Sequence, residues 1–308
     1  MDINNLRQKI KEFLSVEDVL RPDKIKILDE LEEKTYVRKL IAYQGSEGDR
    51  IKAYLYIPKG TGPFPGILLH HQHNGEWHLG KSEVCGLAGD PYQFFGPELA
   101  KNKFAVLAPD SICFEDRRRN ASGTEFTDVD SDWTQHYNEM AYRLVRGELL
   151  MKKVLDDANI AVSILEEQSL VDNSKLGVLG HSYGGQTVLF QGALDERIKF
   201  ACSSGAASSY KNKMEEGTGI ERAAVIPGFI NKFEIVDIVK CFVPRKLLIV
   251  SATKDKYTAD ATEIYNEALK YFEKFGVSDK LIHKRFEGGH GLNKKRFNYI
   301  IDWVVSQK

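Results

Sequence analysis

Cysteine, net charge and long apolar stretches are all scarce in this sequence of 308 residues. Its four cysteines form no C-x-x-C pair, so we expect free thiols and neither a disulfide framework nor a cysteine zinc site. A formal net charge of −1 provides no basic surface for nucleic acid or for an anionic membrane. No apolar run approaches the length of a membrane span, and the charged N-terminus lacks the apolar core of a signal peptide. The sequence therefore predicts a cytoplasmic protein with no nucleic-acid or membrane partner.

The first 34 residues are predicted to form a helical N-terminal extension, because two apolar stripes in this segment repeat at helical spacing. The first stripe consists of Ile3, Leu6, Ile10 and Phe13, and the second of Ile27, Leu28 and Leu31. Two strand-like runs, 35–43 and 50–58, then flank a Gly-Ser-Glu-Gly-Asp turn. This arrangement predicts an antiparallel hairpin.

Short, continuously apolar runs alternate with helical patterns in the rest of the chain. The apolar runs are 66–71, 104–109, 175–180, 198–205 and 246–252. The helical patterns are 92–102, 139–168, 184–194, 258–275 and 293–306. Such alternation predicts one α/β domain with a doubly wound, mostly parallel sheet, an antiparallel edge and helices on both faces. Two segments interrupt it, 111–138 and 206–240, and we expect both to form pocket walls or lids.

A serine stands between glycines where the run 175–180 gives way to a helix, in the hexapeptide Gly180-His181-Ser182-Tyr183-Gly184-Gly185. Small residues two positions to either side let the chain turn sharply and present Ser182 at the tip, as in a nucleophile elbow. A Gly-rich turn whose serine caps the next helix is the structural alternative. The rest of the sequence has to distinguish the two.

A serine nucleophile needs a base, and the base needs an orienting acid. In a doubly wound sheet these groups follow the serine in the order acid, then histidine, each beyond the end of a strand. Asp255 follows the run 246–252, and His290 follows a strand-like run that begins at Leu281. The order therefore predicts Asp255 as the acid and His290 as the base, with a turn aspartate and a surface-loop histidine as the structural alternatives.

Three other residues compete for these two roles. Asp260 lies at the start of the next helix and is the second candidate acid, although a helix cap is an equal use for it. His283 lies inside a strand-like run and is not expected to reach the edge of the sheet. His136 lies in the polar insertion and stays open as a base.

Acyl transfer also needs N–H donors for the oxyanion of the transition state. We expect one from the backbone N–H of Tyr183, the residue after the nucleophile. The second is assigned to the backbone N–H of His73, in the loop that follows the run 66–71.

Histidines gather near this loop and raise a zinc site as an alternative: His70, His71, His73 and His78. His70 and His71 are adjacent on a predicted strand and so point to opposite faces. No cysteine or acidic ligand stands at a familiar spacing. We therefore expect neither a metal nor an organic cofactor.

With these residues in place, the chain resembles the α/β-hydrolase superfamily, in its dienelactone hydrolase and acetyl-xylan-esterase-like branch. The matching motifs are the elbow GHSYGG, the loop LLHHQHNGEWHLGK, the helix LLMKKVLDDANIAVSILEE, Asp255 after LLIVSATK and the histidine of EGGHG. The resemblance assigns residues 35–308 to an α/β-hydrolase domain. It implies a Ser182, Asp255, His290 triad and a carboxylic ester hydrolase activity. Relatives with an HGYNG-like loop carry glycine where this chain has Gln72, so His73 is matched by position only.

The sequence thus predicts a serine esterase that cleaves a small-molecule carboxylic ester through an acyl-enzyme. A peptidase of the prolyl oligopeptidase type shares the elbow, but the residues before 36 are too few for the β-propeller that such peptidases usually carry. A catalytically silent hydrolase fold that binds a ligand is a further alternative. Arg117 and Arg118 are expected in surface ion pairs rather than on an acidic group of the substrate. The sequence leaves open whether the protein forms a homo-oligomer.

Overall fold

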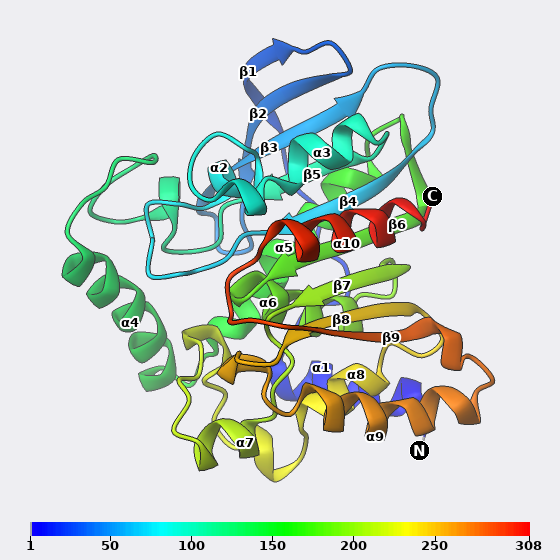
Figure 1. The fold of residues 1–308 in the computed structure, drawn as a ribbon. Helices are drawn as coiled ribbons and strands as arrows, with labels where there is room; N and C mark the ends of the chain where they lie inside the picture. The colour runs from blue at the N-terminus through cyan, green and yellow to red at the C-terminus, as the bar shows by residue number, and fades with distance from the viewer. Residues whose placement is uncertain (1) are drawn as a thin grey trace.

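The computed structural model describes residues 2–308, and nine strands in this part of the chain form one twisted sheet (Figure 1). The strands are β1 (Lys26–Glu32), β2 (Tyr36–Gln44), β3 (Arg50–Pro58), β4 (Phe64–His70), β5 (Ala105–Pro109), β6 (Val171–His181), β7 (Phe200–Ser204), β8 (Lys246–Ala252) and β9 (Leu281–Phe286). Their order in space is β1-β2-β3-β5-β4-β6-β7-β8-β9.

The sheet is antiparallel at its N-terminal edge and parallel elsewhere. β1, β2, β3 and β5 pair antiparallel in that order. From β5 onward, the neighbours in the order β5, β4, β6, β7, β8 and β9 pair parallel. The predicted doubly wound, mostly parallel sheet with an antiparallel hairpin is confirmed. Because β4 and β6 are neighbours but distant in sequence, the loops after these two strands meet at the point where the strand order reverses. Ligands of such sheets bind at this point.

Helices cover both faces of the sheet (Figure 1). They are α1 (Ile3–Leu14), α2 (Lys81–Val84), α3 (Phe95–Lys101), α4 (Val129–Val145), α5 (Leu150–Glu166), α6 (Tyr183–Leu194), α7 (Tyr210–Glu215), α8 (Ile235–Lys240), α9 (Ala261–Lys274) and α10 (Lys294–Val305). One face packs against α3 and α10, and the other against α5, α6, α8 and α9, with α1 outside them. None of these helices is both long and apolar enough to cross a membrane.

The alternation of side chains along the strands separates the two cores. On β8, Leu247 and Ile249 join the core under α5, α6 and α9, whereas Leu248 and Val250 join the core under α3 and α10. Successive side chains of a strand point to opposite faces, so a strand buried on both faces is apolar at every position. This is the reason that the central strands could be predicted from continuous apolar runs.

The predicted helical extension over residues 1–34 is wrong in its second half. The helix α1 ends at Leu14, where Ser15 takes a left-handed conformation with φ 55°. Residues 26–32 instead form β1, which pairs with β2 in antiparallel register, Glu32 opposite Val37. The free edge of β2 offers backbone hydrogen bonds that a lone surface helix cannot match, and local spacing does not reveal such an edge.

The pattern read as one long helix over 139–168 is in fact two helices. α4 begins at Val129, inside the segment 111–138 that is predicted to form a pocket wall or lid, and α5 begins at Leu150. Gly147 between them has φ +76°, the left-handed conformation that commonly ends a helix. α4 extends from the body of the protein at the left of Figure 1.

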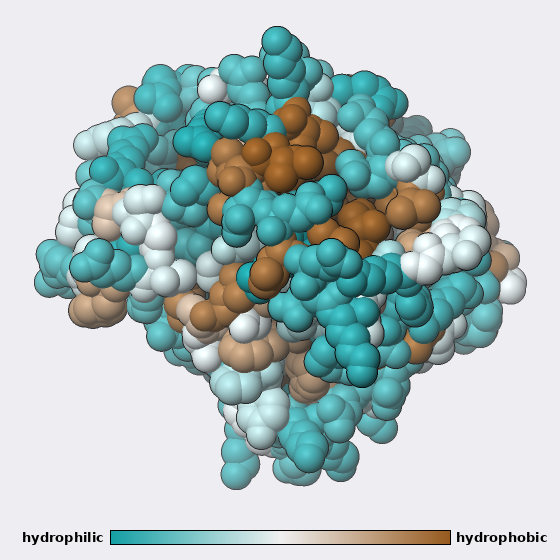
Figure 2. All heavy atoms as spheres, turned by 90° about the horizontal axis from the view of Figure 1, so that it is seen from above, coloured by the Kyte–Doolittle hydropathy of each residue, from teal (hydrophilic) through white to brown (hydrophobic). Residues whose placement is uncertain are grey.

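The edge strand β1 is exposed along most of its length. Its apolar side chains Ile27 and Leu31 remain 52% and 42% exposed. Figure 2 looks down on the face of the molecule that is at the top of Figure 1, where β1 lies. This face is mainly hydrophilic, with a hydrophobic patch near the middle of the view. Because most side chains on both faces of β1 are exposed, its apolar residues need not alternate as they do in a half-buried strand. This is why residues 26–32 could show helical spacing and still form a strand.

Candidate active site

Ser182 lies in the sharp turn between β6 and α6, with φ 55° and ψ −121°. Positive φ is costly for a residue with a side chain and is retained when the surroundings enforce it. Here the Ser182 N–H donates to the Ser204 carbonyl of the neighbouring strand at 2.8 Å, and the Ser182 carbonyl accepts from Gln186 N at 3.0 Å. The strained turn presents the hydroxyl beyond the carboxyl end of β6. This is the geometry of a nucleophile elbow.

The glycines around Ser182 are required by close backbone contacts. A Cβ atom on Gly184 would lie 2.2 Å from the carbonyl oxygen of His70, and one on Gly185 would lie 2.4 Å from that of Ser204. A Cβ atom on Gly180 would lie 2.4 Å from the carbonyl carbon of Gly184. The start of α6 therefore packs directly on the ends of β4 and β7. The loops after both strands are thereby held close to Ser182.

The structure brings together the three residues that the sequence predicted as nucleophile, base and acid. His290 Nε2 lies 2.7 Å from Ser182 Oγ, and His290 Nδ1 lies 3.0 Å from Asp255 Oδ1. The side chain of Asp255 is fully buried, whereas that of His290 is 27% exposed. Both distances are within hydrogen-bond range, so the imidazole can take a proton from the serine while the carboxylate fixes its tautomer.

Asp255 is held in place by groups that also keep it ionised. Its Oδ1 accepts from Tyr257 N at 3.0 Å, and its Oδ2 accepts from the Thr258 hydroxyl at 3.0 Å. Burial pushes the pKa of Asp255 up, but the hydrogen bond and charge of His290, together with Tyr257 and Thr258, outweigh it and hold the pKa below its usual value. The carboxylate therefore remains charged opposite the imidazole at neutral pH.

The alternative candidates lie in other contacts. The carboxylate of Asp260 accepts from the backbone N–H of Ser209 at 3.2 Å, and His283 pairs with the Ser251 hydroxyl at 2.7 Å. His136 is fully buried, and its Nδ1 accepts from the indole N–H of Trp77 at 3.0 Å. None of the three is hydrogen-bonded to Ser182 among residues 2–308.

The two expected oxyanion donors lie in the right elements. Tyr183 is the first residue of α6, and the first backbone N–H groups of a helix have no acceptor within it. His73 follows β4, whose final residue His70 packs against the start of α6. The rings of His73 and Tyr183 are 6.4 Å apart. The assignment of the His73 N–H as the second donor stays a prediction.

Aromatic side chains line the side of Tyr183 that faces the loop after β4. The Tyr183 ring stacks on Phe114 at 5.5 Å, and His73 packs edge-on against Trp77 at 4.5 Å and stacks on His136 at 5.7 Å. Burial, with smaller contributions from Arg222 and His71, lowers the pKa of His73 to about 3. His73 is therefore neutral at physiological pH.

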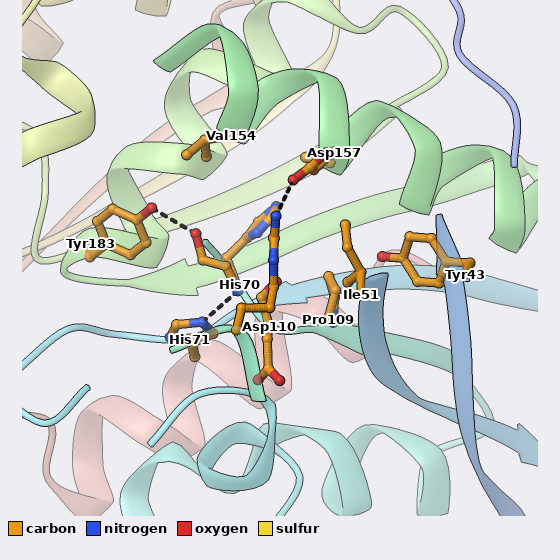
Figure 3. Close-up of a pocket in the computed structure, with 12 residues that line it drawn as sticks. Tyr43, Ile51, His70, His71, Pro109, Asp110, Val154, Asp157 and Tyr183 are labelled. Carbon is orange, nitrogen blue, oxygen red and sulfur yellow. Dashed lines mark hydrogen bonds and ion pairs between the residues drawn. The ribbon is translucent and has the colours of Figure 1, made fainter. Parts of the chain in front are cut away.

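A cavity of about 20 Å³, lined by polar and apolar side chains, lies beside Tyr183, between β4, β5 and α5 (Figure 3). The Tyr183 hydroxyl is 2.7 Å from the Ser111 hydroxyl, and Ser111 N donates to His71 Nε2 at 3.0 Å. This volume holds about one water molecule and no ester substrate. The hydrogen bonds beside this cavity therefore fix the position of the Tyr183 side chain, and the cavity itself is too small to bind the reacting group.

The four histidines near the loop after β4 do not converge on one point. His70 Nε2 pairs with Gln191 Oε1 at 2.6 Å, His71 Nδ1 with the Gln72 carbonyl at 2.8 Å, and His73 Nδ1 accepts from Gly75 N at 3.0 Å. The ring of His78 packs against Phe126 instead. Within the described part of the chain, the group with metal-binding spacing consists of Asp110, Glu115 and Asp116.

A buried lysine lies at the centre of that acidic group. Lys81 Nζ donates to Asp110 Oδ2 at 2.8 Å, to Asp116 Oδ2 at 2.6 Å and to Glu115 Oε1. Burial opposes the charge of Lys81, but Asp110 and Glu115 raise its pKa above the usual value. The Lys81 ammonium thus occupies the position that a metal ion would take between these three carboxylates. Sequence spacing gave no sign of this network, because Lys81, at the start of α2, lies 29 to 35 positions before the three acids, which follow β5.

Arg117 and Arg118 form ion pairs, as expected, but buried ones rather than surface ones. Arg117 pairs with Asp49 at 2.6 Å and Asp157 at 2.7 Å, and Arg118 pairs with Asp132 at 3.0 Å. Both side chains are at most 4% exposed. They therefore brace the insertion 111–138. The arginine that does face the site is Arg222, which the sequence did not single out.

Two family models match the chain, each over more than half of its length. The Dienelactone hydrolase family matches residues 51–216, and the Prolyl oligopeptidase family matches residues 134–304. Both matches include Ser182. Taken with the sheet order and the elbow, they identify the chain as an α/β-hydrolase. Within this class it belongs to the dienelactone hydrolase family, as the sequence predicted, and residues 134–304 match the prolyl oligopeptidase family as well.

Individual relatives agree with this placement. "Putative hydrolase YtaP" of Bacillus subtilis (strain 168) is 26% identical over 272 residues, which are 85% of each chain. A "putative acetyl xylan esterase" of Bacteroides fragilis NCTC 9343 shares 14% identity at a TM-score of 0.77, covering 99% of this chain and 87% of its own. Acetyl Xylan Esterase 1 of Thermoanaerobacterium sp. JW/SL YS485 shares 16% identity at a TM-score of 0.63, covering 99% and 93%. At these identities the solved structures establish a common fold.

Proposed function

We propose that the protein is a serine esterase that cleaves carboxylic esters of small molecules through an acyl-enzyme. The observation that carries the proposal is the hydrogen-bonded row of Ser182, His290 and Asp255 at the tip of a strained elbow. The similarity to solved structures that are named as acetyl xylan esterases supports ester rather than amide chemistry.

The proposed reaction follows from the positions of these groups. His290 Nε2 takes the proton of Ser182 as Oγ attacks the ester carbonyl, and the ionised Asp255 stabilises the imidazolium. The backbone N–H groups of Tyr183 and His73 receive the oxyanion. His290 then gives its proton to the leaving alcohol and activates a water molecule that releases the acid. No step of this chemistry needs a metal or an organic cofactor.

Labelling with a fluorophosphonate probe tests the proposal first, because the probe reacts with activated serines. We expect peptide mapping to place the label on Ser182, and we expect 4-nitrophenyl acetate and butyrate to be turned over. Aminoacyl 4-nitroanilides should be poor substrates. Cleavage of the anilides without the esters would replace the proposal with a peptidase, which the prolyl oligopeptidase match makes the second candidate. Absence of both labelling and turnover in folded protein would leave a silent fold that binds a ligand.

Thr258→Val is expected to lower kcat for 4-nitrophenyl acetate about 3- to 10-fold, which is the worth of one hydrogen bond of roughly 1 kcal/mol. The substitution keeps the shape of the side chain and removes the hydroxyl that donates to Asp255 Oδ2. Steady-state kinetics with Thr262→Val as the control checks this, because Thr262 lies in the first turn of α9 and its hydroxyl accepts from Arg285 rather than bonding to the triad. Equal rates in the two variants would show that Thr258 does not position the acid.

A further inference from the structure

Hydrogen-bond donors outnumber acceptors in a cluster on the loop after β4 and the turn at Arg222. The cluster consists of His73, Trp77, His136 and Arg222, with Trp133 at its outer side. Arg222 lies in the segment 206–240. Its guanidinium stacks over the rings of Trp77 at 5.5 Å and Trp133 at 5.1 Å. This segment thus meets the loop that is assigned to the oxyanion.

The tautomers of the two histidines follow from their partners. His73 Nδ1 accepts a hydrogen bond from Gly75 N, and His136 Nδ1 accepts one from Trp77 Nε1. Burial lowers the pKa of both imidazoles, that of His73 to about 3, so both are neutral. In a neutral imidazole only one nitrogen carries a proton. Both rings therefore carry it on Nε2.

These protons leave donors without acceptors. Arg222 Nη1 lies 3.4 Å from His73 Nε2, and because both atoms carry hydrogen, neither can accept from the other. His136 Nε2 and Arg222 Nε are buried without a hydrogen-bond partner among residues 2–308. Buried donors are normally satisfied, because an unsatisfied one loses its hydrogen bonds to water without replacement. An acceptor with several oxygen atoms is what this cluster lacks.

The charge near the cluster has the sign that such an acceptor needs. Arg222 has no carboxylate within 4.0 Å in the described part of the chain, and the same holds for the buried Lys213. Glu221 is the acidic group that acts on both cations, and Asp260 and Glu234 act on Lys213 as well. Burial raises its pKa, and the charges of Arg222, Lys213 and His290 act against that rise. Glu221 is thus the carboxylate that acts on Arg222, without forming an ion pair with it within 4.0 Å, and the effect of His290 on Glu221 indicates that the proposed triad is near.

We infer that Arg222 and His73 form a subsite for a negatively charged group, a carboxylate above all, that the substrate carries next to its scissile ester. The inference rests on the proposed esterase function and adds a substrate class to it. A carboxylate offers two oxygens to a guanidinium and to a neighbouring imidazole N–H, which matches the donors that lack partners. The aromatic rings of Trp77 and Trp133 hold the guanidinium in place by stacking against it.

The test compares esters that differ only by a carboxylate. Mono-4-nitrophenyl glutarate against 4-nitrophenyl butyrate places the charge on the acyl side, and 4-acetoxybenzoate against phenyl acetate places it on the alcohol side. In Arg222→Gln we expect the ratio of kcat/KM for the charged ester to that for the neutral ester to fall at least tenfold in one of the two pairs, mainly through KM. Arg222→Lys, which keeps the charge, should lose less. Arg146→Gln, an equal loss of charge at the exposed end of α4, is the control and should change the ratio less than twofold.

The outcomes separate this inference from the function on which it rests. If the native protein turns over the neutral esters and Arg222→Gln leaves the ratio of both pairs unchanged, the subsite is refuted and the esterase stands. If the native protein cleaves no ester and takes no fluorophosphonate, the proposed function itself fails. Circular dichroism of each variant shows that it is folded. Should Arg222→Gln not fold, the native protein decides, since a kcat/KM for the charged ester no higher than that for the neutral ester in both pairs would refute the subsite.

Discussion

Replacing Ser182 by alanine is expected to lower kcat for 4-nitrophenyl acetate by about 10⁴- to 10⁶-fold and to abolish fluorophosphonate labelling. The hydroxyl is the proposed nucleophile, so without it only the oxyanion donors and substrate binding remain to lower the barrier. His290→Ala should cost a similar factor, because Oγ would lose the base that lies 2.7 Å away. The double variant should be no slower than either single variant. Groups that act on the same proton transfer lose their effect together.

Two control variants make this result specific. Ser174→Ala lies near the start of the same strand, β6, at the opposite edge of the sheet from Ser182. His283→Ala removes another histidine of the C-terminal region, one that pairs with Ser251. Both should stay within about threefold of the native rate, since neither contacts the reacting groups. A Ser182→Ala protein that kept a tenth of the native activity would contradict the proposal, whatever the controls show.

The parts of the fold that the sequence predicted depend on local patterns. β8 is apolar at each of Leu247 to Val250 because both of its faces are buried, and such a run is recognisable without a structure. The elbow is equally local, since Gly180, Gly184 and Gly185 are needed by contacts within a few residues or with adjacent strands. The order of Ser182, Asp255 and His290 follows from the strand ends at which the three residues stand.

What the sequence did not predict depends on contacts between distant segments. Residues 26–32 have helical spacing and become a strand only because the edge of β2 is free to pair with them. Arg222 meets His73 across 149 positions of the chain, so its place in the site could not be read from any motif. Arg117 and Arg118 were expected at the surface, because a sequence does not show that their partners Asp157 and Asp132 are buried as well.

The network around Lys81 connects the two loops that carry the aromatic wall of the site. Glu115 accepts from Gly80 N at 3.1 Å and from Ser82 N at 2.9 Å, and its own N–H donates to the Trp77 carbonyl at 2.8 Å. Phe114, the preceding residue, stacks on Tyr183. Lys81 is 1% exposed and joins Glu115 to Asp110 at the end of β5. Loss of this lysine should therefore affect both stability and catalysis.

Lys81→Met is expected to lower the free energy of unfolding at pH 8 by about 3–5 kcal/mol, the usual effect of removing one partner from a buried ionic group. Three carboxylates would remain together without their cation. Urea denaturation measures the loss, and Lys52→Met is the matched control. Lys52 contacts Asp116 alone at 2.9 Å and is 27% exposed, so the same substitution there should cost less than about 1 kcal/mol.

The deficit of Lys81→Met should also depend on pH in a defined direction. In the native protein burial and the charge of Glu115 already raise the pKa of Asp110 to about 7, above that of an unfolded chain. A carboxyl group with a raised folded pKa binds more protons when folded, so it lowers stability as pH rises from about 4 towards that value. Without Lys81 the pKa of Asp110 should rise further, and the pKa of Asp116, which the hydrogen bond and charge of Lys81 help to hold below its usual value against burial, should rise as well. The difference in the free energy of unfolding between the native protein and Lys81→Met should thus be largest at pH 8 and decrease towards pH 5. A difference of the same size at both pH values would mean that lost packing, not uncompensated charge, causes the instability.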